Sequence, residues 1–539
     1  MIAEQKKLEP SRCTLCPAGC ELELIQAAPD AWRCEYPKAA GKGLCARGAA
    51  LGELLGHRSR ILTAMRRVDG KPQKVAVDDA LKAIAAAAGD GVTILLDGNV
   101  PCEDLAAGIA WCGAWPQAKL CVVVEPADEQ LLLGVEACGA EYLSSDDLEG
   151  CDGFVIIGDA FASNPACARG VFDRRKAEPK TPLVVIDAAG GTAGKFATHK
   201  VATAPGGELS ALSAVAASAG LSVEDVKGKG SPSAEAAGQA IAECKKLAVM
   251  IAAEYGRTAA WRQIGRLAGQ LAKAKGGGVM CQTTGANALA AVRLACSAGT
   301  VSLGEAMADD SAIRLAVGSD VLGMLGRKGL KVFAAAGALA NTTTEAAEIV
   351  LPLAMPGELS GTYLLEGDRA VKVSPLLEPP AGVLSPAGVI ESLAMAAGVS
   401  RPQIPAPKPA TQRLKPGESA AAPRFSGPPG PVLLVGRQAM HAGCGSLTSH
   451  GSWQAAVQPL PVLALAAEDL REMNIKNLST VTVSVNGRSA QASVRISPEL
   501  PPGTMVITDG YAAVRCLVPS EIGEDGAIIA QPSSAVVGT

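Results

Sequence analysis

Four cysteines near the N-terminus constrain the fold of this chain more than any other feature. Three of them stand within eight residues and the fourth follows in a glycine-flanked segment; they are Cys13, Cys16, Cys20 and Cys45. Thiolates are soft ligands that suit zinc or an iron–sulfur cluster, and three so close together converge on one centre only where the backbone curls. Pro17 and Gly19 allow that curl. The spacing therefore predicts a metal or iron–sulfur site.

The identity of the metal and of the fourth ligand stays open at this point. Cys34 competes with Cys45 for the fourth position. A structural zinc site also takes four thiolates, but zinc sites usually combine two close pairs of cysteines, whereas this chain has a triplet and one more. Some of the 16 cysteines are expected to be inert buried side chains. The triplet favours an iron–sulfur cluster.

This segment resembles the N-terminal domain of the molybdopterin oxidoreductase superfamily, which includes formate dehydrogenases, nitrate reductases and the large peripheral subunit of respiratory complex I. The matching residues are Cys13, Cys16, Cys20, Cys45, Gly48, residues 60–62 and residues 66–70. The resemblance implies that the four cysteines hold a [4Fe-4S] cluster in a domain spanning residues 1–70. Arg47 stands where many members have a lysine on the electron path to the pterin, so the positive charge is kept with a different donor geometry.

Length and composition describe a large globular protein. With 539 residues, of which 48% are apolar and 19% charged, the chain exceeds a single core and is expected to form roughly two to four domains. A net charge of -4, without a basic run mixed with aromatic residues, argues against a nucleic-acid partner. No apolar run reaches the roughly 18 residues of a membrane span, and residues 1–10 lack a secretory signal. Abundant cysteine without export predicts the reducing cytoplasm.

Residues 71–400 alternate between helical and strand patterns. A helix is expected over residues 78–88. Short β-branched runs predict strands over residues 92–96, 120–124, 153–158, 182–187, 278–281, 313–317 and 331–333. Such alternation is typical of an αβα fold built on mostly parallel sheets, here as two interleaved subdomains. Because ligands bind beyond the carboxyl ends of such strands, the residues expected to face a nucleotide-like cofactor are Gly158, Asn164, Asp187 and Thr192.

The superfamily resemblance continues through the loops after these strands. Residues 158–165 are similar to its Gly-Ser-Asn-Pro loop with an insertion, and residues 187–192 to its Asp-Pro-Arg-Arg-Thr loop. Gly206 and Glu208 belong to a segment similar to its Pro-Gly-x-Asp turn. In members with the cofactor these loops contact the guanine dinucleotides of a bis-pterin. This chain lacks the two arginines, which weakens the grip on a phosphate or base by about 1.5 to 3 kcal/mol per lost bond. Ordinary strand-end turns are the alternative interpretation.

Residues 341–352, followed by residues 358–362 and 366–369, carry the strongest resemblance after the cysteines. They are similar to the superfamily's Thr-Glu-Thr-Ala-x-x-Ala-Asp-Val-Val-Leu-Pro block and to the Glu-x-x-Gly-Thr and Glu-x-x-Arg segments that follow it. Complex I members keep this block without molybdenum. The block therefore indicates the superfamily and not the metal.

A proline-rich stretch separates the last part of the chain. Residues 401–430 are expected to form an extended linker. Residues 431–539 contain short alternating strands, and Asn486-Gly487 is a strong hairpin signal. This part resembles the superfamily's C-terminal dinucleotide-binding β-barrel. The resemblance implies that the residues facing the cofactor here are Gly436, Arg437 and His441.

The ligand of a Mo or W centre decides whether the chain carries its own active site. In catalytic members a cysteine, selenocysteine, serine or aspartate binds the metal after an early strand, often beside a histidine. Counting back from residues 139–140 places Glu125 there, and Cys121 lies one strand length earlier. The simpler interpretations are a solvated strand end for Glu125 and a core position for Cys121. No histidine occurs between His57 and His199, so the neighbouring histidine is missing.

Two functions follow from the resemblance. In the first, a Mo or W bis-molybdopterin guanine dinucleotide centre, as in formate dehydrogenases, exchanges electrons with the [4Fe-4S] cluster. In the second, the chain is an electron-transfer and scaffold subunit without Mo or W, similar to the complex I member. Both imply partner chains of the iron–sulfur or flavin/NADH type, because the sequence lacks the ferredoxin-like N-terminal pattern of complete complex I subunits.

Overall fold

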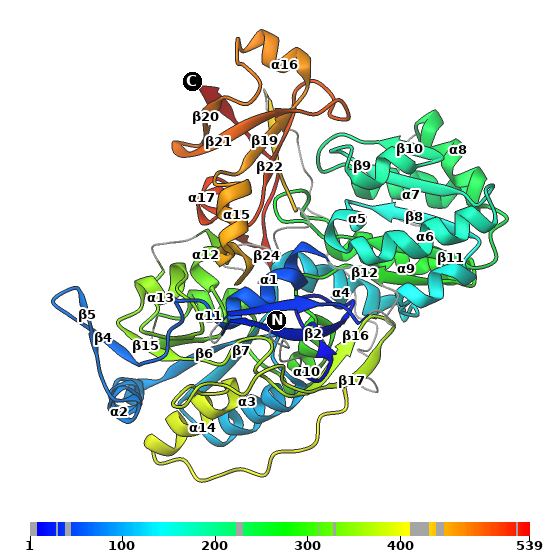
Figure 1. Ribbon diagram of the computed structural model, residues 1–539. Helices are drawn as coiled ribbons and strands as arrows, with labels where there is room; N and C mark the ends of the chain where they lie inside the picture. The colour runs from blue at the N-terminus through cyan, green and yellow to red at the C-terminus, as the bar shows by residue number, and fades with distance from the viewer. Residues whose placement is uncertain are drawn as a thin grey trace, which may run out of the picture.

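The chain is mixed α/β, with two mostly parallel sheets at its core, a small antiparallel sheet near the N-terminus and a curled sheet near the C-terminus. The computed structural model describes residues 8–28, 31–37, 45–222, 230–310, 312–326, 330–409, 431–437, 447–523 and 527–538. In Figure 1 the seven-stranded sheet lies at the lower left, the five-stranded sheet at the right and the curled sheet at the top. The α/β class predicted from the sequence is confirmed.

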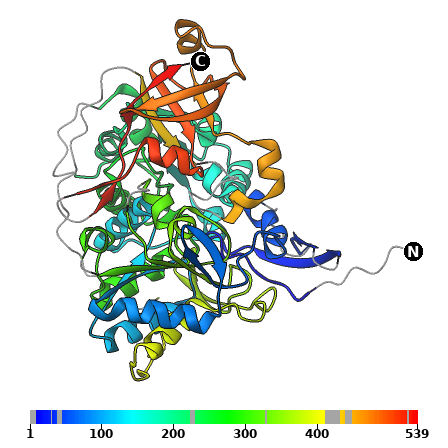
Figure 2. The same ribbon diagram turned by 90° about the vertical axis from the view of Figure 1, so that its left-hand side faces the viewer.

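The N-terminal part packs one helix against a three-stranded antiparallel sheet. Its elements are β1 (Ser11–Arg12), β2 (Glu21–Ala28), β3 (Ala31–Glu35) and α1 (Ala46–Leu55). Leu22 and Leu24 of β2 share one fully buried apolar cluster with Leu51 of α1. Gly52 lets α1 approach β3, because a Cβ atom there would lie 2.7 Å from the Arg33 backbone. Figure 2 shows this sheet projecting from one side of the molecule, below the curled sheet.

A buried ion pair joins the N-terminal part to the core. Arg60 Nη2 donates to Glu358 Oε2 at 2.8 Å, and the two side chains are 5% and 1% exposed. The contact joins two segments that are 298 residues apart in the sequence.

The larger core sheet has seven strands, of which five run parallel. In spatial order they are β5 (Lys71–Lys74), β4 (Met65–Val68), β15 (Ile349–Pro352), β14 (Ala334–Gly337), β13 (Ile313–Val317), β6 (Val92–Asp97) and β7 (Ala118–Val123). A shared apolar cluster packs this sheet against α2 (Val77–Ala87), α3 (Cys102–Ala114), α10 (Ala288–Ala298) and α14 (Pro386–Ala396). The domain boundary predicted at residue 70 falls inside the β4–β5 hairpin, so the core sheet begins before it.

The smaller core sheet has five parallel strands and is inserted between β7 and β13. Its order is β10 (His199–Ala202), β9 (Leu183–Asp187), β8 (Gly153–Ile157), β11 (Leu247–Ile251) and β12 (Gly278–Cys281). One apolar cluster packs it against α4 (Pro126–Cys138), α7 (Glu208–Ser218), α8 (Pro232–Ile241) and α9 (Trp261–Ala274). A second cluster packs it against α5 (Ala160–Ser163) and α6 (Pro165–Ala177). The strands of the larger sheet are therefore interrupted in the chain by those of the smaller one.

The C-terminal sheet is curled, and its two edge strands follow one another in the chain. Its order is β25 (Ser533–Ser534), β18 (Val432–Gly436), β22 (Thr504–Thr508), β19 (Val462–Leu465), β21 (Arg488–Ile496), β20 (Thr480–Val485) and β26 (Val536–Gly538). Only Ala535 separates the edge strands. Asn486 and Gly487 both have positive φ, at 47° and 78°, and form the predicted two-residue hairpin turn. The sequence predicts a barrel for residues 431–539, and the structure shows a curled sheet there.

The predicted strands mostly occur where the sequence places them. One is displaced: residues 331–333 precede the strand, and β14 starts at Ala334, which pairs with Leu315 of β13. Small alanine side chains fill this buried central strand, so tertiary packing outweighs the β propensity of the preceding residues. Of the proline-rich stretch, residues 401–408 have no regular secondary structure and are mostly exposed. In the part of the chain that the structure describes, no helix combines the length and apolarity of a membrane span.

Candidate functional site

The loop between β1 and β2 curls as the cysteine spacing predicts. Cys13 N donates to Cys20 O at 2.8 Å, and Gly19 N donates to Cys16 O at 3.3 Å. Gly19 has a φ of 55°, and a Cβ atom on it would lie 2.2 Å from Leu365 Cδ1. Glycine therefore suits this curl, where the loop packs closely on β16 (Gly361–Leu365).

Cys45 comes to the same place from the start of α1. Its Sγ accepts a hydrogen bond from Gly48 N at 3.4 Å. A Cβ atom on Gly48 would lie 3.8 Å from Cys45 Sγ and 3.9 Å from Cys13 Sγ, so the two thiols lie around this glycine. Tyr36 Oη accepts from Cys45 N at 3.3 Å and donates to the thiol of Cys20. Sequence reasoning missed Tyr36, which lies between two of the predicted ligands.

The thiols of the four predicted ligands also influence one another. Burial raises the pKa of Cys13, and the nearby thiols of Cys16, Cys45 and Cys20 add to the effect. Burial likewise raises the pKa of Cys20 to about 12, with further contributions from Cys16 and Cys45. None of the four forms a disulfide. The structure therefore places four free thiols within electrostatic reach of one another.

Cys34 lies apart from this group. It stands on β3 in the apolar cluster of the N-terminal part, where burial raises its pKa to about 12 and no other cysteine of the described chain contributes. Of the two candidates for the fourth position, the structure favours Cys45. Across the described residues, no three His, Cys, Asp or Glu side chains form a site for a single metal ion.

Arg47 lies beside the cysteines and is only 1% exposed. Burial raises the pKa of Cys16, and the charge of Arg47 partly offsets this rise. Arg47 Nη2 donates to Ser163 O, but Nε and Nη1 have no hydrogen-bond partner among the described residues. Asn164 follows Ser163 in the chain, and its Nδ2 also lacks a hydrogen-bond partner among the described residues. Buried donors without acceptors thus extend from Cys16 to the predicted cofactor residue Asn164.

The carboxyl ends of β8 and β9 bring together the predicted loop residues. Thr192 N donates to Asp159 Oδ2 at 2.7 Å, and Asp187 Oδ2 accepts from Gly191 N at 2.6 Å. Gly158, at the end of β8, has a φ of 74° and would place a Cβ atom 2.6 Å from Ala252 O. Gly206 turns the chain with a φ of 78° just before α7. The expected grouping at the strand ends is present.

Arg257, which the sequence did not single out, lies among these residues. It is 2% exposed and forms ion pairs with Asp187 and Glu254. Its Nε also lies 3.6 Å from Glu208 Oε1. Burial raises the pKa of Glu208 to about 7, and the charge of Arg257 opposes that rise. The charge of Arg257 is therefore balanced by carboxylates of its own chain.

The predicted residues of the C-terminal part are also engaged within the protein. Gly436 ends β18, and its carbonyl accepts from Asp509 N at 2.9 Å. Arg437 donates to Ala253 O at 2.6 Å and to Gln282 O at 3.2 Å, and is 5% exposed. His441 lies outside the described residues.

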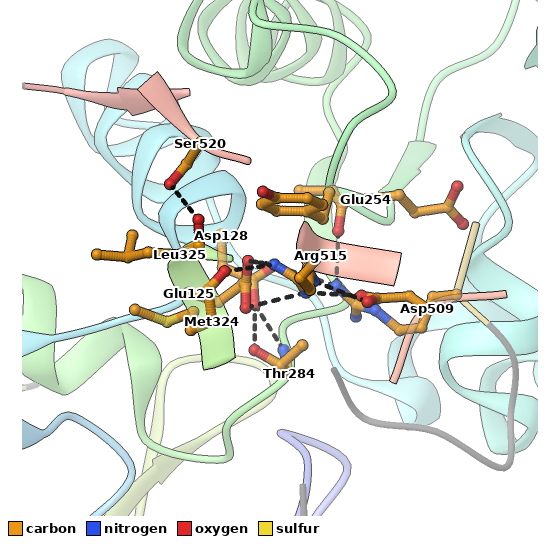
Figure 3. A network of polar contacts seen from close by, with 12 residues as sticks. Glu125, Asp128, Glu254, Thr284, Met324, Leu325, Asp509, Arg515 and Ser520 are labelled. Carbon is orange, nitrogen blue, oxygen red and sulfur yellow. Dashed lines mark hydrogen bonds and ion pairs between the residues drawn. The ribbon is translucent and has the colours of Figure 1, made fainter. Parts of the chain in front are cut away.

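Glu125 lies two residues after the end of β7 and caps the start of α4, and it is not solvated. Its side chain is 8% exposed and forms a bidentate ion pair with Arg515 of α17 (Ala512–Leu517), with Nη1–Oε1 at 3.0 Å and Nη2–Oε2 at 3.4 Å. Figure 3 shows Arg515 between Glu125 and Asp509. The interpretation of Glu125 as a solvated strand end is therefore wrong. Cys121 is fully buried in an apolar cluster, which agrees with its interpretation as a core residue.

A cavity of about 210 Å³ lies between the cysteine loop, the ends of β6 and β7, and the residues after β13. Leu15 of the cysteine loop lines it, as do Glu125 and His450. Asn99 Nδ2 in the wall donates to Thr14 O at 3.0 Å, which ties the cavity to the cysteine loop. The cavity thus lies between Leu15 of the cysteine loop and Glu125, the residue predicted as a metal ligand.

Comparison with known proteins identifies the fold only. The sequence matches no family model and no curated protein. Among solved structures, acetylene hydratase from Pelobacter acetylenicus is similar, with a TM-score of 0.64 over 98% of this chain and 100% of that chain. The sequences are 12% identical. The likeness therefore concerns the whole fold and carries no residue-level assignment.

Proposed function

We propose that this chain is a redox subunit that relays electrons by means of a [4Fe-4S] cluster held by Cys13, Cys16, Cys20 and Cys45. The observation that carries the proposal is that these four free thiols lie within electrostatic reach of one another, two of them beside Gly48, with the unpartnered donors of Arg47 near Cys16. The sequence resemblance to molybdopterin oxidoreductases and the fold shared with acetylene hydratase support it.

The residues around the thiols suit such a cluster. When bound, the cluster would supply one-electron chemistry at this place. Gly48 leaves space between Cys13 and Cys45 that a side chain would fill. Tyr36 donates a hydrogen bond to the thiol of Cys20, and Arg47 places a positive charge near Cys16. Both would favour an added electron.

Partner chains complete the proposal. A relay needs a donor and an acceptor, and we infer that these are other redox subunits of the iron–sulfur or flavin/NADH type in a cytoplasmic complex. A second candidate, an enzyme with its own Mo or W bis-pterin centre, is favoured by the similarity to acetylene hydratase over the whole chain, including the curled C-terminal sheet.

Elemental analysis of anaerobically purified protein tests the proposal. We expect about four iron atoms and four sulfides per chain, with an electron paramagnetic resonance signal after reduction. Cys45→Ser should lose most of this iron. Cys34→Ser is the matched control, because Cys34 is buried in the same part of the chain but apart from the four thiols. Zinc without iron, or equal losses in both variants, would refute the cluster assignment.

A further inference from the structure

Arg515 lies where the sequence resemblance would place a Mo or W centre. Glu125, the predicted ligand, directs both carboxylate oxygens at this guanidinium. The two residues are 390 positions apart, so the contact joins the C-terminal part to the core. Both oxygens of this carboxylate therefore already accept hydrogen bonds from a cation of the chain itself.

All five N–H groups of Arg515 have acceptors. Besides the two bonds to Glu125, Nε and Nη2 donate to the carboxylate of Asp509 at 2.7 and 2.6 Å, and Nη1 donates to Met324 O at 3.3 Å. The ring of Tyr255 stacks 3.6 Å from the guanidinium carbon. Because a guanidinium has five donors, this set is complete without any ligand.

The charged groups farther from the cysteines also offer a bis-pterin dinucleotide few free cations. Its phosphates require cations or free N–H groups. Arg257 directs its Nη1 and Nη2 to the carboxylates of Glu254 and Asp187, and its Nε lies 3.6 Å from Glu208 Oε1 without a hydrogen bond. Arg437 donates to two carbonyls of this chain. The cavity is lined by the carboxylates of Asp97, Glu125 and Asp320, and no described lysine or arginine lines it. Its volume of about 210 Å³ is below the roughly 300 to 1,000 Å³ of small-molecule sites.

We propose that Arg515 takes the place of a Mo or W centre, so that this chain carries electrons without a bis-pterin of its own. The Glu125–Arg515–Asp509 network instead fastens α17 to the core. Two further hydrogen bonds join the residues after α17 to the core. Tyr255 Oη donates to Val518 O at 2.5 Å, and Ser520 Oγ donates to Leu325 O at 3.1 Å. The inference deepens the proposed relay function and rests on it.

The first test measures Mo, W, pterin and iron in one sample of the full chain, made in cells supplied with molybdate and tungstate. We expect about four iron atoms per chain and less than one-tenth of an equivalent of Mo, W or extractable pterin. One equivalent of Mo or W with its pterin would overturn the inference while leaving the cluster intact. Absence of iron would instead refute the proposed function, so the two failures are distinguishable.

The second test follows hydrogen exchange of residues 509–520 by mass spectrometry. In Glu125→Gln the amide NH2 would face a guanidinium N–H, so exchange should be at least several-fold faster, and faster still in Arg515→Gln. Glu468→Gln is the matched control, because Glu468 pairs with Arg471 on the surface of the same part of the chain. Unchanged exchange in Glu125→Gln would show that Glu125 does not hold Arg515 and would overturn the inference.

Discussion

Arg47 and Arg515 are both 1% exposed, yet they are used in opposite ways. Arg515 has an acceptor for each of its five N–H groups, whereas Arg47 leaves Nε and Nη1 without a partner among the described residues. An unpaired buried donor costs free energy, which a bound anionic group would recover. The comparison distinguishes an arginine with open donors beside the cysteines, where we propose the cluster, from an arginine whose donors are all used within the protein.

The largest effect on stability is expected from replacing Arg515, whose donors are all used within the protein. Arg515→Met would leave Glu125 and Asp509 buried without their cation and should lower the free energy of unfolding by about 3 to 5 kcal/mol. Arg47→Met should cost less in protein without metal, because it removes one hydrogen bond and two unpaired donors. Urea unfolding followed by circular dichroism measures both.

Arg471→Met is the control for this pair, because Arg471 is 75% exposed and its ion pair is on the surface. Its unfolding midpoint should stay close to that of the original protein. Equal losses for Arg47→Met and Arg515→Met would remove the distinction between the two arginines.

The next effect concerns the reduction potential of the proposed cluster. Arg47→Met removes a positive charge that lies near Cys16, and an added electron is less stable without it, so the potential should fall. Arg47→Lys keeps the charge and should shift the potential less. A redox titration followed by electron paramagnetic resonance, with iron content as the check on loading, measures both variants. An unchanged potential in Arg47→Met would place Arg47 outside the field of the cluster.

The reduction potential of Arg515→Met provides a second test of the difference between Arg47 and Arg515. The network of Arg515 does not include any of the four cysteines. Its loss should therefore change stability and leave the potential of the remaining folded protein unaltered. A potential shift as large as that of Arg47→Met would contradict the separation of the two places.

A smaller shift is expected from the hydrogen bond of Tyr36. Tyr36→Phe removes the donor to the Cys20 thiol and the acceptor of Cys45 N, without changing a charge. The potential should fall, by less than in Arg47→Met, with the iron content preserved. Tyr511→Phe is the control, because Tyr511 Oη bonds to Gln458 O in the C-terminal part. If the two tyrosine variants behave alike, Tyr36 has no special relation to the cluster.

Local pattern predicted much of the fold but not these two networks. Strand runs, the Asn486-Gly487 turn and the curl at Gly19 follow from nearby residues, and the structure reproduces them. The choice between Cys34 and Cys45 required knowing which thiol the fold turns toward the other three. Arg515 meets Glu125 across 390 residues, and nothing in the sequence around either residue indicates the contact. Long-range ion pairs of this kind are fixed by how whole subdomains pack.

The smallest expected effect is a difference in pH dependence between Asp509 and Glu125, the two carboxylates that pair with Arg515. Burial alone would raise the pKa of Asp509, but the charge and hydrogen bonds of Arg515 outweigh it, so the pKa lies below its ordinary value. Burial raises the pKa of Glu125 despite the same arginine. Folding therefore favours the ionised form of Asp509. Its contribution to the free energy of unfolding is fully present above about pH 3.9, the pKa of an aspartate in the unfolded chain, and is lost as the pH falls further.

Asp509→Asn should accordingly lower the free energy of unfolding at pH 7 by more than Glu125→Gln does. The deficit of Asp509→Asn should stay constant between pH 7 and about 5 and shrink below about pH 4, as Asp509 of the original protein takes up a proton. Urea unfolding at a series of pH values measures it. A deficit that persists unchanged at pH 3 would mean that Asp509 acts through packing or neutral hydrogen bonds. The Arg515 network would then be held by packing and not by charge, and it would differ less from the surroundings of Arg47 beside the cysteines.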